Sequence, residues 1–290
     1  MKADPVTRRA WPRAATVFRA FKYGVYGLLL LNLLLFFRED SLAAAETFRD
    51  GIRWADLAEA YAATMDTAFW IVLLLLFELE TAVIPDRLLR GRLKWALAAV
   101  RSCCYVFITL ALWGYCAKWA TVSALEPFVV ANVCELVGQG FTWINDLDQY
   151  PPLDASACAA LQGLDLVRIQ GTQIIGNAEA GLAITRLAMV DIVNAADWLL
   201  IVLLLEVEVT LQLRGGLTPG LIRAFKWLKG CMYATLFAAA VYWGLLGDFL
   251  DFWDAFLWLV AFVFIEMNIF NWNAEVQEEK AQEELLLADV

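Results

Sequence analysis

Residues 194–213 read NAADWLLIVLLLEVEVTLQL, an apolar stretch whose second half contains the acids Glu206 and Glu208. A helix rises about 1.5 Å per residue, so about 20 residues cross the roughly 30 Å of hydrocarbon in a bilayer. The stretch therefore predicts a membrane-spanning helix that carries two carboxylates within the membrane.

The same arrangement of residues occurs three times along the chain. In each copy a polar residue is followed by Trp after four positions, by Glu after twelve and by a second polar residue after fourteen. The three sets are Asp66, Trp70, Glu78 and Glu80; Asn194, Trp198, Glu206 and Glu208; and Asp254, Trp258, Glu266 and Asn268. Identical spacing without gaps indicates an internal repeat.

A motif of basic and aromatic residues opens the other three apolar segments. It occupies Arg19 to Tyr23, Arg92 to Trp95 and Arg223 to Trp227. Together with the returning segments it defines three repeated helical hairpins, for which we expect a pseudo-threefold arrangement. The six predicted spans are residues 20–37, 66–84, 95–115, 194–213, 226–246 and 253–272.

The composition of the 290-residue chain agrees with a membrane location. Hydrophobic residues make up 61% of the chain, whereas about half is typical of a soluble domain. The predicted fold class is therefore an all-α membrane protein with six transmembrane helices. The predicted parts are residues 1–115 with the first three spans, an insertion at 116–193, spans four to six at 194–273 and an acidic tail at 274–290.

The distribution of Lys and Arg predicts the orientation, because loops rich in these residues stay in the cytoplasm. Basic residues cluster before the first span and after the second and fourth, whereas the first and last connectors are acidic. Both termini are therefore expected in the cytoplasm, with the chain in a bacterial inner (plasma) membrane.

The insertion at residues 116–193 is too long for a simple loop. We expect it to be extracytoplasmic and mostly helical, with one helix over Trp119–Val137, while Ile174–Val190 lies on the membrane surface or extends the fourth span. Cys134 and Cys158 can form a disulfide outside the cytoplasm. Two free thiols, or pairing with Cys116, are the alternatives.

The repeated acids are the candidate site. Twelve residues of helix place Glu78, Glu206 and Glu266 about 18 Å from the start of their spans, still within the hydrocarbon. Because such an acid costs roughly 2.5 to 3.5 kcal/mol in lipid, it usually faces protein or a cavity. Residues two apart on a helix point about 200° apart, so we expect only this first set to face inward. The second set is Glu80, Glu208 and Asn268.

Nearby basic residues offer a structural alternative. Arg101 lies within the third predicted span, and three lysines mark the cytoplasmic helix starts as a gate or as anchors. These lysines are Lys22, Lys94 and Lys226. Their side chains can extend along the helix towards the acids, which would make a ring of ion pairs between the hairpins. The sequence leaves this ring and a functional cation or proton site equally open.

The leading functional hypothesis is a cation or proton channel or transporter that uses the intramembrane carboxylates. The alternative is a non-catalytic accessory or assembly subunit of a larger membrane protein complex. Partners are then the lipid bilayer and either further copies of the chain or other membrane subunits. Nothing in the charge pattern indicates nucleic-acid binding.

An enzyme ranks last among the hypotheses. The chain has no His, which removes the commonest general base and metal ligand. Carboxylates alone can bind Mg or Mn, but no activated nucleophile is evident near them. We therefore expect neither catalysis nor a cofactor, and the sequence does not decide whether a metal binds.

Overall fold

The computed structural model of the chain describes residues 12–80, 91–213, 218–247 and 249–262. Long helices dominate these residues. They are α1 (Pro12–Thr47), α3 (Ala62–Glu78), α4 (Arg92–Ser123), α6 (Ala178–Leu213), α7 (Pro219–Leu246) and a helix over 249–262. A single short turn of helix, α2 (Leu57–Ala60), precedes α3.

Three of the described helices are long and apolar enough to cross a membrane: Val17–Thr47, Arg92–Ser123 and Ala178–Glu208. This confirms the prediction of a mainly helical chain with membrane-spanning segments. The remaining predicted spans, 66–84, 226–246 and 253–272, coincide with α3, α7 and the helix over 249–262. Residues 81–84 and 263–272 of those spans, and the acidic tail at 274–290, lie outside the described residues.

The chain divides into two compact units, residues 33–253 and residues 1–32 together with 254–290. Within the smaller unit, Asn32 Nδ2 donates a hydrogen bond to Asp254 Oδ1 at 2.9 Å. Asp254 also accepts a hydrogen bond from Trp258, one turn further along its own helix. Asn32 is fully buried, so this contact satisfies a polar group that would otherwise be costly within an apolar helix.

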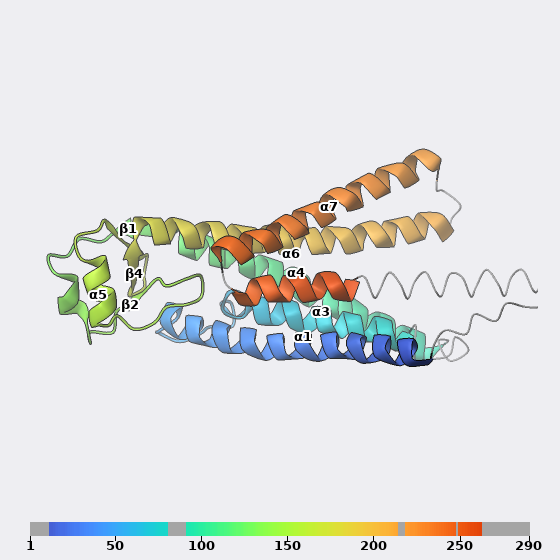
Figure 1. Cartoon of the computed structure of the whole chain (residues 1–290), viewed down its shortest axis with the longest axis horizontal. Coiled ribbons are helices and arrows are strands. Elements are labelled where there is room, and N and C mark those ends of the chain that lie inside the picture. The colour runs from blue at the N-terminus through green and yellow to red at the C-terminus, as the bar shows by residue number, and fades with distance from the viewer. Residues whose placement is uncertain (1–11, 81–90, 214–217, 248, 263–290) are drawn as a thin grey trace, which may run out of the picture. The chain divides into compact units, whose positions relative to one another are not determined.

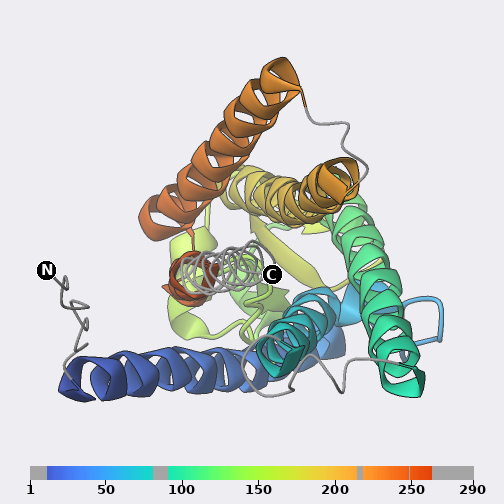
Figure 2. The same cartoon turned by 90° about the vertical axis from the view of Figure 1, so that its right-hand side faces the viewer.

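Within the larger unit, helices that follow one another in the chain pack together. Here α4 packs between α3 and α6, and α7 packs against α6 (Figures 1 and 2). The short helix α2 packs so closely on α4 that a Cβ atom at Gly114 would lie 1.9 Å from the backbone oxygen of Ala58. Only glycine allows this approach.

Helix α4 has 32 residues and is therefore about 48 Å long, well beyond the thickness of the hydrocarbon. Between its end and the start of α6, residues 124–177 form a small domain at one end of these helices (Figure 1), which we call the inserted domain. Its elements are β1 (Leu125–Pro127), the 3₁₀ helix η3 (Val133–Leu136), β2 (Thr142–Trp143), α5 (Ala155–Leu161), β3 (Leu166–Ile169) and β4 (Ile174–Asn177).

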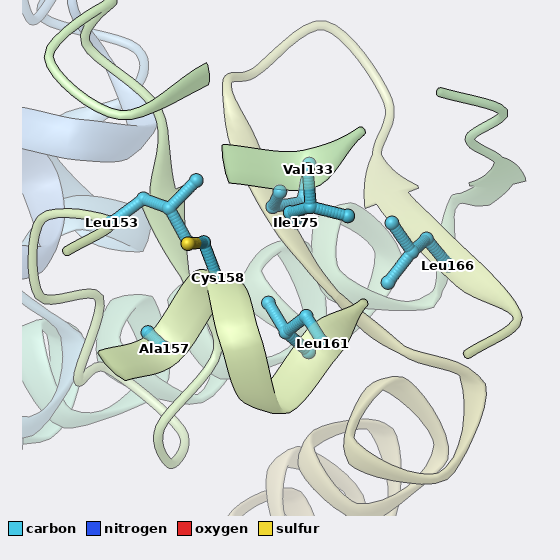
Figure 3. Packing of buried hydrophobic residues seen from close by; sticks show 7 residues of the cluster. All are labelled: Val133, Leu153, Ala157, Cys158, Leu161, Leu166 and Ile175. Carbon is cyan, nitrogen blue, oxygen red and sulfur yellow. The ribbon is translucent and has the colours of Figure 1, made fainter. Parts of the chain in front are cut away.

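The strands of the inserted domain form a sheet in the order β1-β3-β4-β2. Its pairs β1–β3 and β3–β4 are antiparallel, with Arg168 opposite Ile175, whereas β2 and β4 are parallel, with Thr142 opposite Ile174. Helices η3 and α5 close over this sheet and bury a compact apolar cluster (Figure 3). The cluster consists of Val133, Leu153, Ala157, Cys158, Leu161, Leu166 and Ile175.

The prediction that the insertion at 116–193 is mostly helical is wrong, and so is the helix predicted over Trp119–Val137. Helices α4 and α6 extend into it from both sides, and the residues between them form a mixed sheet and helix domain. The helix expected over Trp119–Val137 ends at Ser123, since Pro127 lacks an N–H and restricts the residue before it to an extended conformation. Residues 174–177 form β4, and α6 begins at Ala178, so most of Ile174–Val190 extends the fourth helix.

Candidate functional site

A buried lysine lies in the last turns of α4, next to the inserted domain. The Nζ atom of Lys118 donates a hydrogen bond to Asp148 Oδ2 at 2.6 Å and lies 3.5 Å from Asp40 Oδ1. Asp40 belongs to α1, and Asp148 belongs to a turn of the inserted domain. One ammonium group thus joins two membrane-spanning helices to the inserted domain.

The second oxygen of Asp40 is held by the start of α3. Asp40 Oδ2 accepts hydrogen bonds from the backbone N of Thr64 at 2.9 Å and from its Oγ1 at 2.7 Å. Asp40 is only 1% exposed, so these bonds and Lys118 replace the water that the carboxylate loses. The arrangement fixes the carboxylate between three helices.

A third carboxylate contributes to the charge balance at Lys118. Asp191 of α6 interacts electrostatically with the ammonium group, as do Asp148 and Asp40. The carboxylates of Asp40 and Asp191 also interact electrostatically with the phenol of Tyr115, one turn earlier on α4. Among the described residues, two carboxylates therefore contact the ammonium group, and a third acts on it electrostatically. The group lies beyond the predicted spans, next to the inserted domain, where burial makes an unpaired charge costly.

Asp148 lies in a tight turn at residues 145–150, which we call the Asp148 turn. In the described segments, Asp148 is the one non-glycine residue with a positive φ, at 62°. Gln149 Nε2 donates a hydrogen bond to Glu39 Oε1 of α1 at 3.1 Å. Leu147 and Tyr150 are both buried. Burial, followed by the charge of Asp148, raises the pKa of the Tyr150 phenol, which therefore stays protonated near neutral pH.

A small recess lies beside Lys118 and Asp148. Its volume is about 20 Å³, which is room for about one water molecule. The recess is bounded by the end of α1, by α2, by α4 and by Tyr150. On its wall, Thr121 Oγ1 donates a hydrogen bond to Glu59 Oε1 at 2.6 Å. Across the described part of the chain, no group of three or more Cys, Asp and Glu side chains is placed to hold a metal ion.

The structure separates the acids that were predicted to face inward together. Glu78, at the end of α3, is 5% exposed, whereas Glu206 on α6 is exposed in the single chain. The inward orientation of Glu206 stays a prediction, because the second half of the third hairpin lies partly outside the described residues. The buried face of α6 runs through Trp198, Ile201 and Leu204, and helical periodicity continues that face to position 208. Glu266 lies outside the described residues.

The second-position acids form ion pairs. Glu80 pairs with Arg101 of α4, and Lys229 of α7 donates a hydrogen bond to Glu208 at 2.7 Å. Each pair joins a helix to the next one along the chain, and in each the two residues are 21 positions apart. Arg101, the basic residue within the third predicted span, therefore pairs with an acid of the second set. Asn268 lies outside the described residues.

The three lysines that were predicted as a gate or as anchors do not share one environment. Lys22 is buried, and its ammonium group lies 5.4 Å from the ring centre of Tyr23. Lys94 and Lys226 are both exposed. The cation that meets Glu208 is instead Lys229, which the sequence analysis did not select.

Two of the repeated tryptophans lie against each other within the larger unit. The ring centres of Trp70 and Trp198 are 6.2 Å apart, and Trp198 is buried. These side chains therefore pack between α3 and α6. Trp70 Nε1 also donates a hydrogen bond to Asp66 Oδ1 at 3.0 Å, the same i to i+4 contact that joins Asp254 and Trp258.

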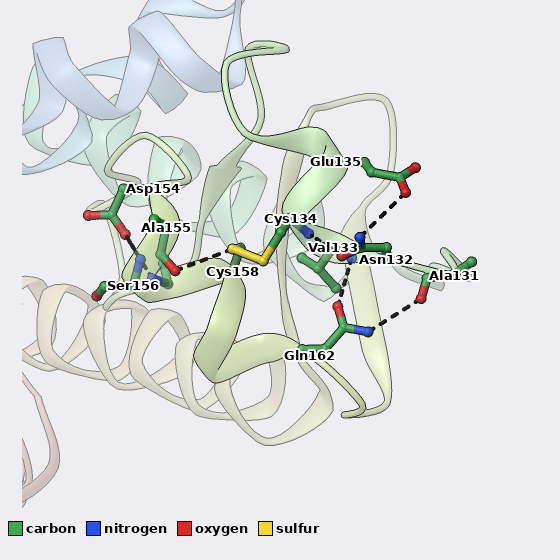
Figure 4. The surroundings of a disulfide bond; sticks show 11 residues. Ala131, Asn132, Val133, Cys134, Glu135, Asp154, Ala155, Ser156, Cys158 and Gln162 are labelled. Atoms are coloured by element: carbon green, nitrogen blue, oxygen red, sulfur yellow. Dashed lines mark hydrogen bonds between the residues drawn. A yellow bond between two sulfur atoms is a disulfide. The ribbon is translucent and has the colours of Figure 1, made fainter.

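Cys134 and Cys158 form a disulfide that ties η3 to α5, with their Cα atoms 5.0 Å apart (Figure 4). Side chains at the helix starts support this link. Asn132 accepts a hydrogen bond from the backbone N of Cys134, and Asp154 accepts from the first backbone N–H groups of α5. Of the alternatives that the sequence left open, the structure has the bonded pair, with Cys116 as a free thiol.

Sequence reasoning missed the cluster of Lys118, Asp40, Asp148 and Asp191. The available signal was one lysine in the apolar end of α4, one aspartate near the end of α1 and two aspartates in α6, since charged residues among apolar ones need partners when they are buried. Asp148 gave no such signal, because an aspartate in a polar turn is ordinary.

Comparisons with protein-family models, with curated proteins and with solved structures find no significant match to this chain.

Proposed function

We propose that the protein is a non-catalytic membrane subunit that holds the inserted domain in a fixed position on a helical scaffold, where it contacts other proteins of a complex. The observation that carries this proposal is the pairing of Glu80 with Arg101 and of Glu208 with Lys229. One acid from each of two copies of the repeat is thereby committed to joining successive helices. A partly exposed pair of this kind holds helices in register, although it adds little net stability.

The proposed scaffold is a set of six spans in three repeated hairpins around a pseudo-threefold axis. The equal separation of 21 positions in the two ion pairs supports the repeat. So does the contact of Trp70 with Trp198, because equivalent residues approach each other near a rotation axis. The third copy supports it through the Asp254–Trp258 hydrogen bond, which matches the bond between Asp66 and Trp70.

The proposed orientation places both termini in the cytoplasm of a bacterium, with the chain in the inner membrane and the inserted domain on the opposite side. The disulfide supports this placement, because disulfides persist outside the reducing cytoplasm. A domain that is closed covalently and fastened to the helices through Lys118 is suited to present one fixed surface to a partner.

Site-specific photocrosslinking in cells tests the proposal. A photoreactive amino acid at Val129, which is 95% exposed on the inserted domain, should give one discrete crosslinked product with a second polypeptide. The same amino acid at Ile52, an exposed residue outside the domain, is the matched control and should not give that product. Equal products from both positions, or products only between copies of this chain, would contradict the assembly role.

A cation or proton channel or transporter is the second candidate, favoured by the three carboxylates around Lys118. If transport is the function, reconstituted vesicles should show a proton or cation flux that the Asp40→Asn and Asp191→Asn variants abolish. The Glu78→Gln, Glu206→Gln and Glu266→Gln variants test the acids of the repeat in the same assay. A flux that all five variants leave unchanged would remove these carboxylates from the pathway.

A further inference from the structure

The inserted domain touches the helices through contacts that differ in kind. Its chain is continuous with α4 and α6, and these covalent connections are permanent. The Asp148 turn, by contrast, reaches α4 and α1 through side-chain contacts: Asp148 with Lys118, and Gln149 with Glu39. Of these two polar contacts, the ion pair at 2.6 Å is the stronger, because it involves a buried cation.

We propose that the Asp148 turn is a reversible latch between the inserted domain and the helices, in which Lys118 passes from Asp148 to Asp40 and Asp191 as the turn lifts. Opening the latch uncovers the recess bounded by α1, α2 and α4. The latch is a property of one chain, goes beyond the proposed assembly role and can be tested without a partner.

The charge arrangement makes the latch reversible. Removing the partner of a buried cation is normally very costly, because it leaves an uncompensated charge in a medium of low dielectric constant. Here Asp40 Oδ1 already lies 3.5 Å from Lys118 Nζ, and Asp191 acts on the same ammonium group. The cation therefore keeps a partner when Asp148 leaves. The adjacent recess has room for the water molecule that would occupy the vacated position.

The backbone of the turn has one uncommon conformation. The φ of 62° at Asp148 lies in the left-handed region, which L-residues other than Asn and Asp seldom adopt. Leu147 and Tyr150 are buried when the turn is in place, so their burial opposes opening and favours return to the closed position.

Hydrogen exchange of the full-length chain in lipid nanodiscs tests the latch. The Asp148→Asn variant removes the charge but keeps a residue that tolerates positive φ. We expect the amides of the Asp148 turn to exchange about tenfold faster or more, with those of α5, β3 and β4 unchanged. The Asp40→Asn variant removes the competing carboxylate, so the turn should exchange at the original rate or more slowly.

Matched controls separate the latch from a general loss of charge. Asp165→Asn changes an exposed aspartate of the inserted domain and should leave the turn unaffected. In Lys118→Ala the turn should open, and added n-propylammonium, the missing part of the side chain, should slow its exchange again. The latch is wrong if Asp148→Asn leaves the turn protected, if Asp40→Asn or Asp165→Asn accelerates it equally, or if exchange rises throughout residues 124–177.

Discussion

Lys118 connects two helices of the larger unit to the inserted domain. It is buried and joins α1, α4 and the inserted domain through two aspartates. Its hydrocarbon stem is surrounded by protein, and its ammonium group ends at the recess. The residue therefore contributes to the position of the inserted domain as well as to local stability.

Replacing Lys118 by Met should lower the free energy of unfolding by about 3–5 kcal/mol, because the shape is nearly kept while buried carboxylates lose their cation. Adding Asp148→Asn to that variant should recover part of the loss, since one uncompensated charge is removed as well. Denaturant titration in detergent measures both values. Lys94→Met, at an exposed lysine, should change stability by no more than about 0.5 kcal/mol.

At the scale of elements, the apolar runs predicted the long helices, since crossing a bilayer requires internally satisfied backbone groups over a known length. The inserted domain could not be predicted in this way. Its strands contain two to four residues each, and their pairing depends on contacts such as that of Arg168 with Ile175, which local patterns do not reveal.

The candidate site was predicted only in part. Acids within predicted spans left charge pairing as one of two equal alternatives, and the pair of Arg101 with Glu80 involves two residues that the sequence singled out. The direction of Glu206 could not be fixed from the sequence, because the buried face of α6 depends on its neighbours α4 and α7. The Lys118 cluster required the turn at Asp148, whose place in space follows from the fold of the whole inserted domain.

The contact of α2 with α4 depends on Gly114. Substitution by Ala places a Cβ atom 1.9 Å from a backbone oxygen, so we expect α2 to be displaced and stability to fall by about 1–3 kcal/mol. The matched control is Gly230→Ala in α7, where a Cβ would meet open space. That change should be neutral or stabilise the helix by about 0.5–1 kcal/mol. Equal midpoints of thermal unfolding for both variants would refute the close contact.

The ion pair between α6 and α7 should tolerate exchange of its charges. Glu208→Lys alone and Lys229→Glu alone each place like charges together and should lower the thermal midpoint, whereas the double variant should restore most of the loss. If the double variant is as unstable as the sum of the single variants, the two residues do not pair.

The disulfide acts on the inserted domain as a unit. It closes a segment with a sequence separation of 24 residues, so replacing Cys134 and Cys158 by Ser should cost about 3 kcal/mol of local stability. Faster hydrogen exchange in α5 and η3, with α4 unchanged, is the expected result. Cys116→Ser, which removes a free thiol, should leave all three elements as they were.

For the whole molecule, the central claim is that ion pairs hold a helical scaffold together so that it can present the inserted domain within a larger complex. Glu80 with Arg101 and Glu208 with Lys229 fix successive helices, and Lys118 fastens the domain to them. In this account the charges serve assembly, and the chain acts through what it contacts.

The most direct test is the mass of the native particle, extracted gently from the membrane of its own cell and measured by native mass spectrometry. The account predicts a defined complex in which this chain is present together with at least one different polypeptide in fixed ratio. Particles composed only of this chain, at every protein and detergent concentration used, would contradict it.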